Sequence, residues 1–157
     1  MPMNTESYEK GCEALKAQDY KAAEREFCEA LKLVDEHSPS YNRITSCLGL
    51  TRVLNSDRNG LLLCRDAASS EKTDADVFLN LACAEWHCSN RERAIDAVVR
   101  GRDIDAGHQQ LARASSLLDS RRRNVLPFLP RGHFLNRTLG RMMRREPTPL
   151  SVHKLLY

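Results

Sequence analysis

The chain has 157 residues, which is enough for one domain with its own hydrophobic core, and it contains only seven glycines and six prolines. Aromatic residues make up 6% of it, and its apolar residues are mostly Ala, Leu and Val, which favours closely packed helices over a β-sandwich. The net charge is +3, no apolar run approaches the roughly 20 residues that cross a bilayer, and the first residues lack a signal-peptide pattern, so we expect an all-α, cytoplasmic protein.

A first helix pair is predicted between residues 5 and 35. Apolar residues recur at helical spacing over 5–17, residues 17–19 interrupt the pattern, and Asp19 can cap a second helix that runs to about residue 35. Small residues let two helix backbones approach closely, and an aromatic ring fills the space between neighbouring pairs. The residues expected to do this are Gly11, Ala23, Phe27 and Ala30.

A second helix pair is predicted between residues 38 and 70. Ser38 can cap its first helix and Pro39 suits the first helical position, while a break at residues 55–57 leads to a second helix that ends near residue 70. The small residue that Gly11 supplies in the first pair recurs at Gly49, slightly more than one repeat length further along the chain. This interval predicts that the second pair repeats the first.

A third pair is expected to begin at Thr73 with Asp76, and the small residue of its first helix is Ala82. After a break at Ser89, the sequence Ser-Asn-Arg-Glu at 89–92 has the form of a capping box for the next helix. A further amphipathic helix over 107–121 is expected to cover the open end of the array. Its apolar residues are Leu111, Ala114, Leu117 and Leu118, and the packing positions of the helix before it are Ala94, Val98 and Gly101.

Gly11, Tyr20, Ala23, Phe27 and Ala30 match, in one register, the small and aromatic positions of the tetratricopeptide repeat, a helix-turn-helix unit of about 34 residues. Over residues 4–121 the chain resembles three such units, at about 4–37, 42–73 and 74–106, followed by a capping helix at 107–121. The second unit departs from the pattern, with Leu61 at a small position and Arg65 at an aromatic one. The resemblance implies an α-solenoid, a right-handed superhelix of antiparallel helix pairs.

The resemblance also implies a function, because in this family the first helices of successive units line a concave groove where peptides lie. The expected role is a non-catalytic scaffold or adaptor that binds a peptide or protein segment. Trp86 is either an anchor for the partner or packed against the next helix. By register, the groove residues are Thr5, Tyr8, Cys12, Lys16, Arg43, Ser46, Leu50, Val53, Asp76, Leu79, Cys83 and Trp86.

Two uses known in the family lead to different expectations. Members that bind the C-terminal carboxylate of heat-shock chaperones use Lys, Arg and Asn, whereas the matching positions here are Tyr8, Cys12, Cys47, Asp76 and Asn80, which argues against that ligand. Compact three-repeat chaperones of bacterial secretion systems are similar in size and repeat number. A dedicated secretion chaperone is therefore an alternative.

The sequence contains no catalytic constellation, and we expect neither an enzyme nor a cofactor. Six cysteines, all in predicted helices and never spaced as Cys-x-x-Cys, are expected to be reduced thiols packed as small apolar side chains. Cys83, His87 and Cys88 would be the alternative start of a metal site, but no second pair with metal-binding spacing accompanies them.

A boundary is expected near Ser120, where the charge changes sign. Residues 1–120 contain 15 Lys and Arg against 20 Asp and Glu, whereas residues 121–157 contain 9 against 1. The extension at 122–157 also holds Pro127 and Pro130, and residues 124–135 are expected to pack on the last helix pair. An alternative is that it binds nucleic acid or an anionic membrane through a basic surface. That surface would consist of Arg121, Arg122, Arg123, Arg137, Arg141, Arg144 and Arg145.

Overall fold

The computed structural model describes residues 5–118, and within this range all regular secondary structure is helical, as predicted. No helix in the described range is long and apolar enough to cross a membrane. The expectations for the arginine-rich extension, and for residues 119–121 of the last helix, lie outside the described residues. The helices are α1 (Thr5–Lys16), α2 (Tyr20–Lys32), α3 (Pro39–Leu54), α4 (Gly60–Ser70), α5 (Ala75–His87), α6 (Arg91–Ile104) and α7 (Gln109–Leu118).

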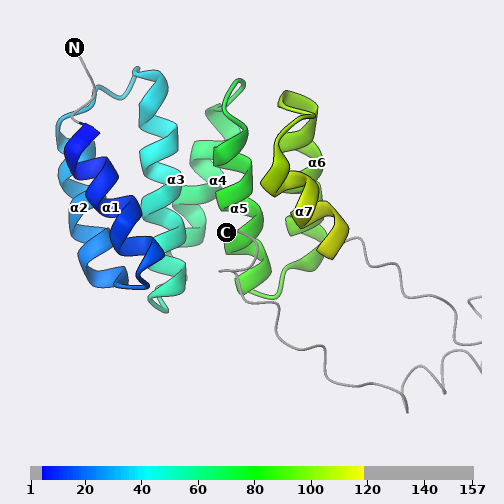
Figure 1. The fold of residues 1–157 in the computed structure, drawn as a ribbon, viewed down its shortest axis with the longest axis horizontal. Coiled ribbons are helices and arrows are strands. Elements are labelled where there is room, and N and C mark those ends of the chain that lie inside the picture. The colour runs from blue at the N-terminus through cyan, green and yellow to red at the C-terminus, as the bar shows by residue number, and fades with distance from the viewer. Residues whose placement is uncertain (1–4, 119–157) are drawn as a thin grey trace, which may run out of the picture.

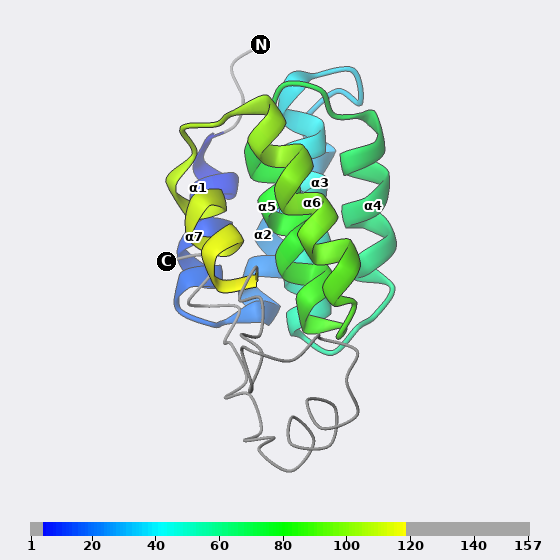
Figure 2. The same cartoon turned by 90° about the vertical axis from the view of Figure 1, so that its right-hand side faces the viewer.

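The helices lie side by side in chain order, from α1 and α2 at one end of the molecule to α6 and α7 at the other (Figure 1). Each helix packs on the next one along the chain, and α3 also packs on α5. Figure 2 turns the molecule by 90° and shows α7 and α6 at the near end. We refer to α1, α3, α5 and α7 as the first helices and to α2, α4 and α6 as the second helices.

Two of the predicted helix caps are confirmed. Asp19 precedes α2, and its side chain accepts a hydrogen bond from the backbone N–H of Ala22 at 3.0 Å. Ser38 precedes α3 and accepts one from the N–H of Ser40, while Pro39 is the first helical residue. Each cap satisfies a backbone donor that has no partner within the helix, which fixes where the helix begins.

The two predicted starts in the third pair are wrong in detail. The N-cap of α5 is Asp74, whose side chain accepts from the N–H of Asp76 at 3.0 Å, and not Thr73. No capping box opens α6, because Ser89 has a φ of 65° and the cap position falls on Asn90. The Asn90 side chain instead donates to Glu85 at 2.8 Å, so it is not used as a cap.

The turns inside the three helix pairs share one backbone geometry. Gln18, Ser56 and Ser89 have φ values of 61°, 70° and 65°, in the left-handed region that residues other than glycine rarely adopt. Their spacing along the chain is identical to that of the small residues at positions 11, 49 and 82, so the three pairs are built alike. A matching hydrogen bond closes each turn: Gln18 N to Leu15 O (3.1 Å), Ser56 N to Val53 O (3.1 Å) and Ser89 N to Trp86 O (2.9 Å).

The hydrophobic core consists of two adjoining clusters. One lies among α1, α2 and α3 around Phe27 and Ile44, and the other extends from α3 to α7 around Phe78 and Leu111. Phe27 lies against Gly11, where a Cβ would come within 2.7 Å of its ring. The small residue of α1 therefore makes room for the aromatic residue of α2, as the sequence predicts.

Arg65, which occupies an aromatic position of the repeat pattern, makes an ion pair between helix pairs. Its guanidinium binds both carboxylate oxygens of Glu85 on α5, with Nε 2.7 Å from Oε1 and an NH₂ group 3.0 Å from Oε2. Glu85 is only 2% exposed, and its second oxygen also accepts from Asn90. A bidentate, charge-assisted contact thus takes the place of ring packing between α4 and α5.

Gly49→Ala is expected to lower the free energy of unfolding by about 1–3 kcal/mol, because an added methyl group would overpack the contact between α3 and α4. A Cβ at Gly49 would lie 2.6 Å from the backbone oxygen of Gly60 and 2.7 Å from the sulfur of Cys64. Gly107→Ala is the control, since there the nearest atom is a side-chain oxygen of Asp105 at 3.3 Å. Urea denaturation of both variants checks this, and equal stability of the two would contradict it.

Candidate functional site

The first helices share a side that points away from the second helices, and we call it the inner face. On α5, Phe78 and Glu85 point toward the second helices, since Arg100 of α6 lies 4.7 Å over the Phe78 ring and Glu85 binds Arg65 of α4. With 3.6 residues per turn, Asp76 and Cys83 lie on the opposite side of α5. On α5, the inner face is thus the side opposite Phe78 and Glu85, whose contacts with α6 and α4 are known.

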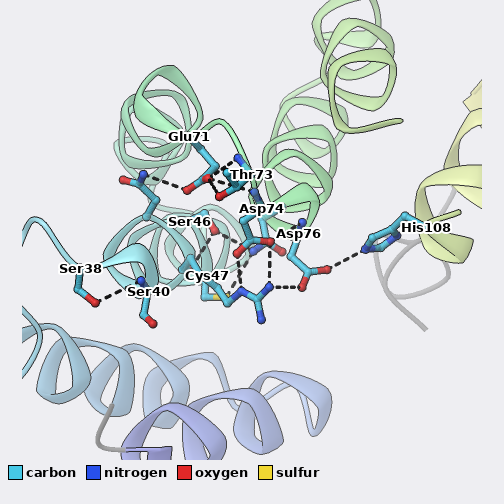
Figure 3. Close-up of polar contacts among 12 residues, drawn as sticks. Ser38, Ser40, Ser46, Cys47, Glu71, Thr73, Asp74, Asp76 and His108 are labelled. Atoms are coloured by element: carbon cyan, nitrogen blue, oxygen red, sulfur yellow. Dashed lines mark hydrogen bonds and ion pairs between the residues drawn. The ribbon is translucent and has the colours of Figure 1, made fainter. Parts of the chain in front are cut away.

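At one end of the inner face, charged side chains form a ladder across α3, α5 and the residue preceding α7 (Figure 3). Arg43 donates to Asp74 at 2.9 Å and pairs with Asp76 at 3.0 Å, and the other oxygen of Asp76 lies 2.9 Å from Nε2 of His108. Both Asp76 oxygens are therefore engaged. Hydrogen bonding to Asp74 raises the pKa of Arg43 above its ordinary value despite partial burial, so the guanidinium stays charged.

Next to this ladder, polar groups of α3 and α5 are joined by hydrogen bonds. The side-chain amide of Asn80 donates to Ser46 Oγ at 2.9 Å and lies 3.3 Å from the sulfur of Cys47. Burial raises the pKa of the Cys47 thiol to about 12 and also raises the pKa values of Cys12 and Tyr8. These groups stay protonated at neutral pH, so the thiols do not have the character of nucleophiles.

The loop between α4 and α5 is organised by the carboxylate of Glu71. One of its oxygens accepts from the backbone N–H groups of Lys72, Thr73 and Asp74 at 2.8–3.0 Å, and the other accepts from the side chain of Asn42 on α3 at 3.0 Å. Burial alone would raise the pKa of Glu71, but these hydrogen bonds outweigh it and lower the pKa to about 2. The charged form of Glu71 thus holds the start of α5 against α3.

The structure places the residues that sequence reasoning assigned to the groove in two groups. Tyr8, Cys12 and Trp86 are partly buried, Lys16 is exposed, and Arg43 and Asp76 lie in the ladder. The other group is a correction: its members are fully buried core residues or nearly so, and they do not line an open groove. They are Ser46, Leu50, Val53, Leu79 and Cys83.

Sequence reasoning missed Glu71, Asp74 and His108 as members of this site. A signal for His108 was present, because Arg43, Asp76 and His108 follow one another at almost equal intervals and so occupy equivalent places in successive pairs. Asp74 and Glu71 carry no such signal. Their roles depend on the path of the loop before α5, which helix periodicity does not describe.

The six cysteines are free thiols, and five of them lie inside helices as expected. Cys88 is the exception, because it follows the last residue of α5 as its C-cap. Within residues 5–118 no group of three or more His, Cys, Asp or Glu side chains is arranged to hold a metal ion.

No protein-family model matches this chain, and no curated protein shows significant sequence similarity to it.

Glu71→Gln is expected to lower the free energy of unfolding by about 3 kcal/mol at pH 7. This is the free energy that corresponds to the lowering of the Glu71 pKa from 4.5 in the unfolded chain to about 2 in the folded protein. Because the folded pKa is the lower one, this stability is present above about pH 4.5 and is lost as the pH falls toward 2. The difference between wild type and variant should therefore disappear near pH 2. Urea denaturation between pH 7 and pH 2 measures it.

The control for this experiment is Glu36→Gln, which changes an exposed carboxylate in the loop before α3 and leaves that of Glu71 in place. It should follow the wild-type dependence on pH. If Glu71→Gln also followed the wild-type curve throughout, the carboxylate would not be the group that organises the loop.

Proposed function

We propose that this chain is a tetratricopeptide-type solenoid that acts without catalysis, as a cytoplasmic scaffold or adaptor that binds an extended protein segment on its inner face. The observation that carries this proposal is the recurrence of one helix-pair unit, with left-handed turn residues at Gln18, Ser56 and Ser89. Such a recurrence aligns the first helices, and their shared side becomes one continuous surface.

The chemistry of the inner face favours an apolar ligand segment. The side chains of Arg43 and His108 are both engaged with Asp76 at one end. Tyr8 and Trp86 are partly buried and pack against the two core clusters, with part of each side chain accessible. Aromatic side chains that are anchored in this way contribute strongly to interfaces, because their surface is large and little conformational entropy is lost on binding.

Binding can be tested with peptides selected from a random display library on the full-length protein. Tyr8→Ala or Trp86→Ala is expected to weaken a selected peptide at least tenfold, or about 1.4 kcal/mol, through loss of an aromatic contact. Lys16→Glu is a third variant, which changes an exposed residue of α1. Isothermal titration calorimetry measures the dissociation constants, and circular dichroism checks that each variant is folded.

The matched control is Leu62→Ala on α4, which removes an equally apolar side chain that is 57% exposed on a second helix. This change should leave the dissociation constant unaltered. Selected peptides that bind all inner-face variants as tightly as wild type, or that lose affinity only with Leu62→Ala, would refute binding on the inner face.

A further inference from the structure

Two matching rows of side chains run along the inner face, and both are buried in the middle and accessible at the ends. One row lies on α3 and the other on α5, and corresponding members are separated by the same interval as Gly49 and Ala82. The middle residues are 0% exposed. The rows are Arg43, Leu50 and Leu54 on α3, and Asp76, Cys83 and His87 on α5, and the end residues are partly or largely exposed.

Helices α4 and α6 cover only one side of α5. The helices that pack most on α5 are α3, α4 and α6, and its side opposite Phe78 and Glu85 faces away from α4 and α6. Yet all residues from 77 to 85 are buried, which is more than two full turns of helix. A helix in a two-layer array normally keeps one side in water. Burial on this side as well indicates a further element that covers the middle of the inner face.

We propose that this element is the C-terminal segment of the same chain, residues 151–157, which lies across the middle of the inner face and competes there with the partner. The inference rests on the proposed function, since it names an occupant for the surface assigned to partner binding. The protein would then bind other segments only after its own has been displaced.

The length and composition of residues 119–157 favour this segment. Residues 119–157 follow α7, and fully extended they would span up to about 130 Å and reach any part of the inner face. Residues 151–157 include the apolar Val152, Leu155, Leu156 and Tyr157, which suit the surface around Leu50 and Cys83. Tethering raises the local concentration of such a segment to the millimolar range.

Charge supports the same assignment. The described residues 5–118 contain 15 Lys and Arg against 19 Asp and Glu, whereas residues 119–157 contain 9 against 2. The two parts therefore attract each other. The arginines at 131–145 would lose their hydration on an apolar surface at high cost, which disfavours that part of the extension. Two stretches that flank it are richer in apolar residues: 125–129, which is uncharged, and 152–157, in which Lys154 is the charged residue. Residues 125–129 are expected to pack near α7, which is separated from α3 by α5.

The cover can be measured by the reactivity of buried thiols in the full-length protein. Cys83 lies on the inner face, and Cys64 lies between α3 and α4, where its thiol donates to the backbone oxygen of Ser46 at 3.4 Å. Burial lowers the reactivity of both thiols, and it raises the pKa of Cys83 to about 12. N-Ethylmaleimide labelling followed by peptide mass spectrometry gives the rate for each cysteine, so Cys64 reports global opening in the same molecule.

In the double variant Leu155→Asp, Leu156→Asp, labelling of Cys83 should become at least tenfold faster while that of Cys64 stays at the wild-type rate. An excess of the synthetic peptide of residues 151–157 should slow the labelling of Cys83 again. The matched control is Val125→Asp, Leu126→Asp, which places the same charges in the other apolar stretch and should leave Cys83 at its wild-type rate.

Each other result overturns the proposal. An unchanged Cys83 rate shows that residues 155 and 156 do not cover it, and an effect of the control pair alone assigns the cover to residues 125–129. If the labelling rates of Cys83 and Cys64 rise together, the segment stabilises the whole fold. If the protection of Cys83 is lost when the protein is diluted, the cover belongs to a second copy of the chain. If selected peptides still lose affinity with Tyr8→Ala or Trp86→Ala, the proposed function stands in each of these cases.

Discussion

The close approach of the two helices within each pair is the constraint on which the rest of this structure depends. At Gly49 and Gly60 the backbones of α3 and α4 meet, and a side chain on either residue would run into the other helix. At Gly11 the contact is with the ring of Phe27, and at Gly101 it is with Phe78 of the same pair and with Leu111 of α7. Because packed interiors tolerate little added volume, these contacts fix where each first helix lies relative to its second helix.

Fixed helix pairs explain why the charged ladder forms. Arg43, Asp76 and His108 occupy equivalent positions of successive units, so a regular offset between units brings Asp76 within 3.0 Å of both Arg43 and His108. Arg43 and Asp76 are about 40% exposed, and ion pairs of that kind contribute little to stability. Their effect is on the character of the inner face, since charges engaged with each other do not attract a charged ligand, and the apolar surface beside them determines what binds.

Sequence periodicity predicted the helices and their order because the same small and apolar residues recur in each pair. It also predicted the caps at Asp19 and Ser38, which depend on local side-chain chemistry. The start of α6 was mispredicted because Ser89 adopts the left-handed conformation of the turn, so that the cap position falls on Asn90. The groove residues were assigned by register, which gives direction and not accessibility, so the burial of Leu50 and Cys83 was missed.

The departure of the second unit from the repeat pattern has a consequence for how the units are joined. An aromatic residue at position 65 would pack against any apolar neighbour, whereas Arg65 requires a carboxylate at one place on the adjoining helix, and Glu85 supplies it. Removing either partner would leave a charge in or beside the core, at a cost far larger than the pair itself contributes. The pair therefore specifies the register between the second and third units.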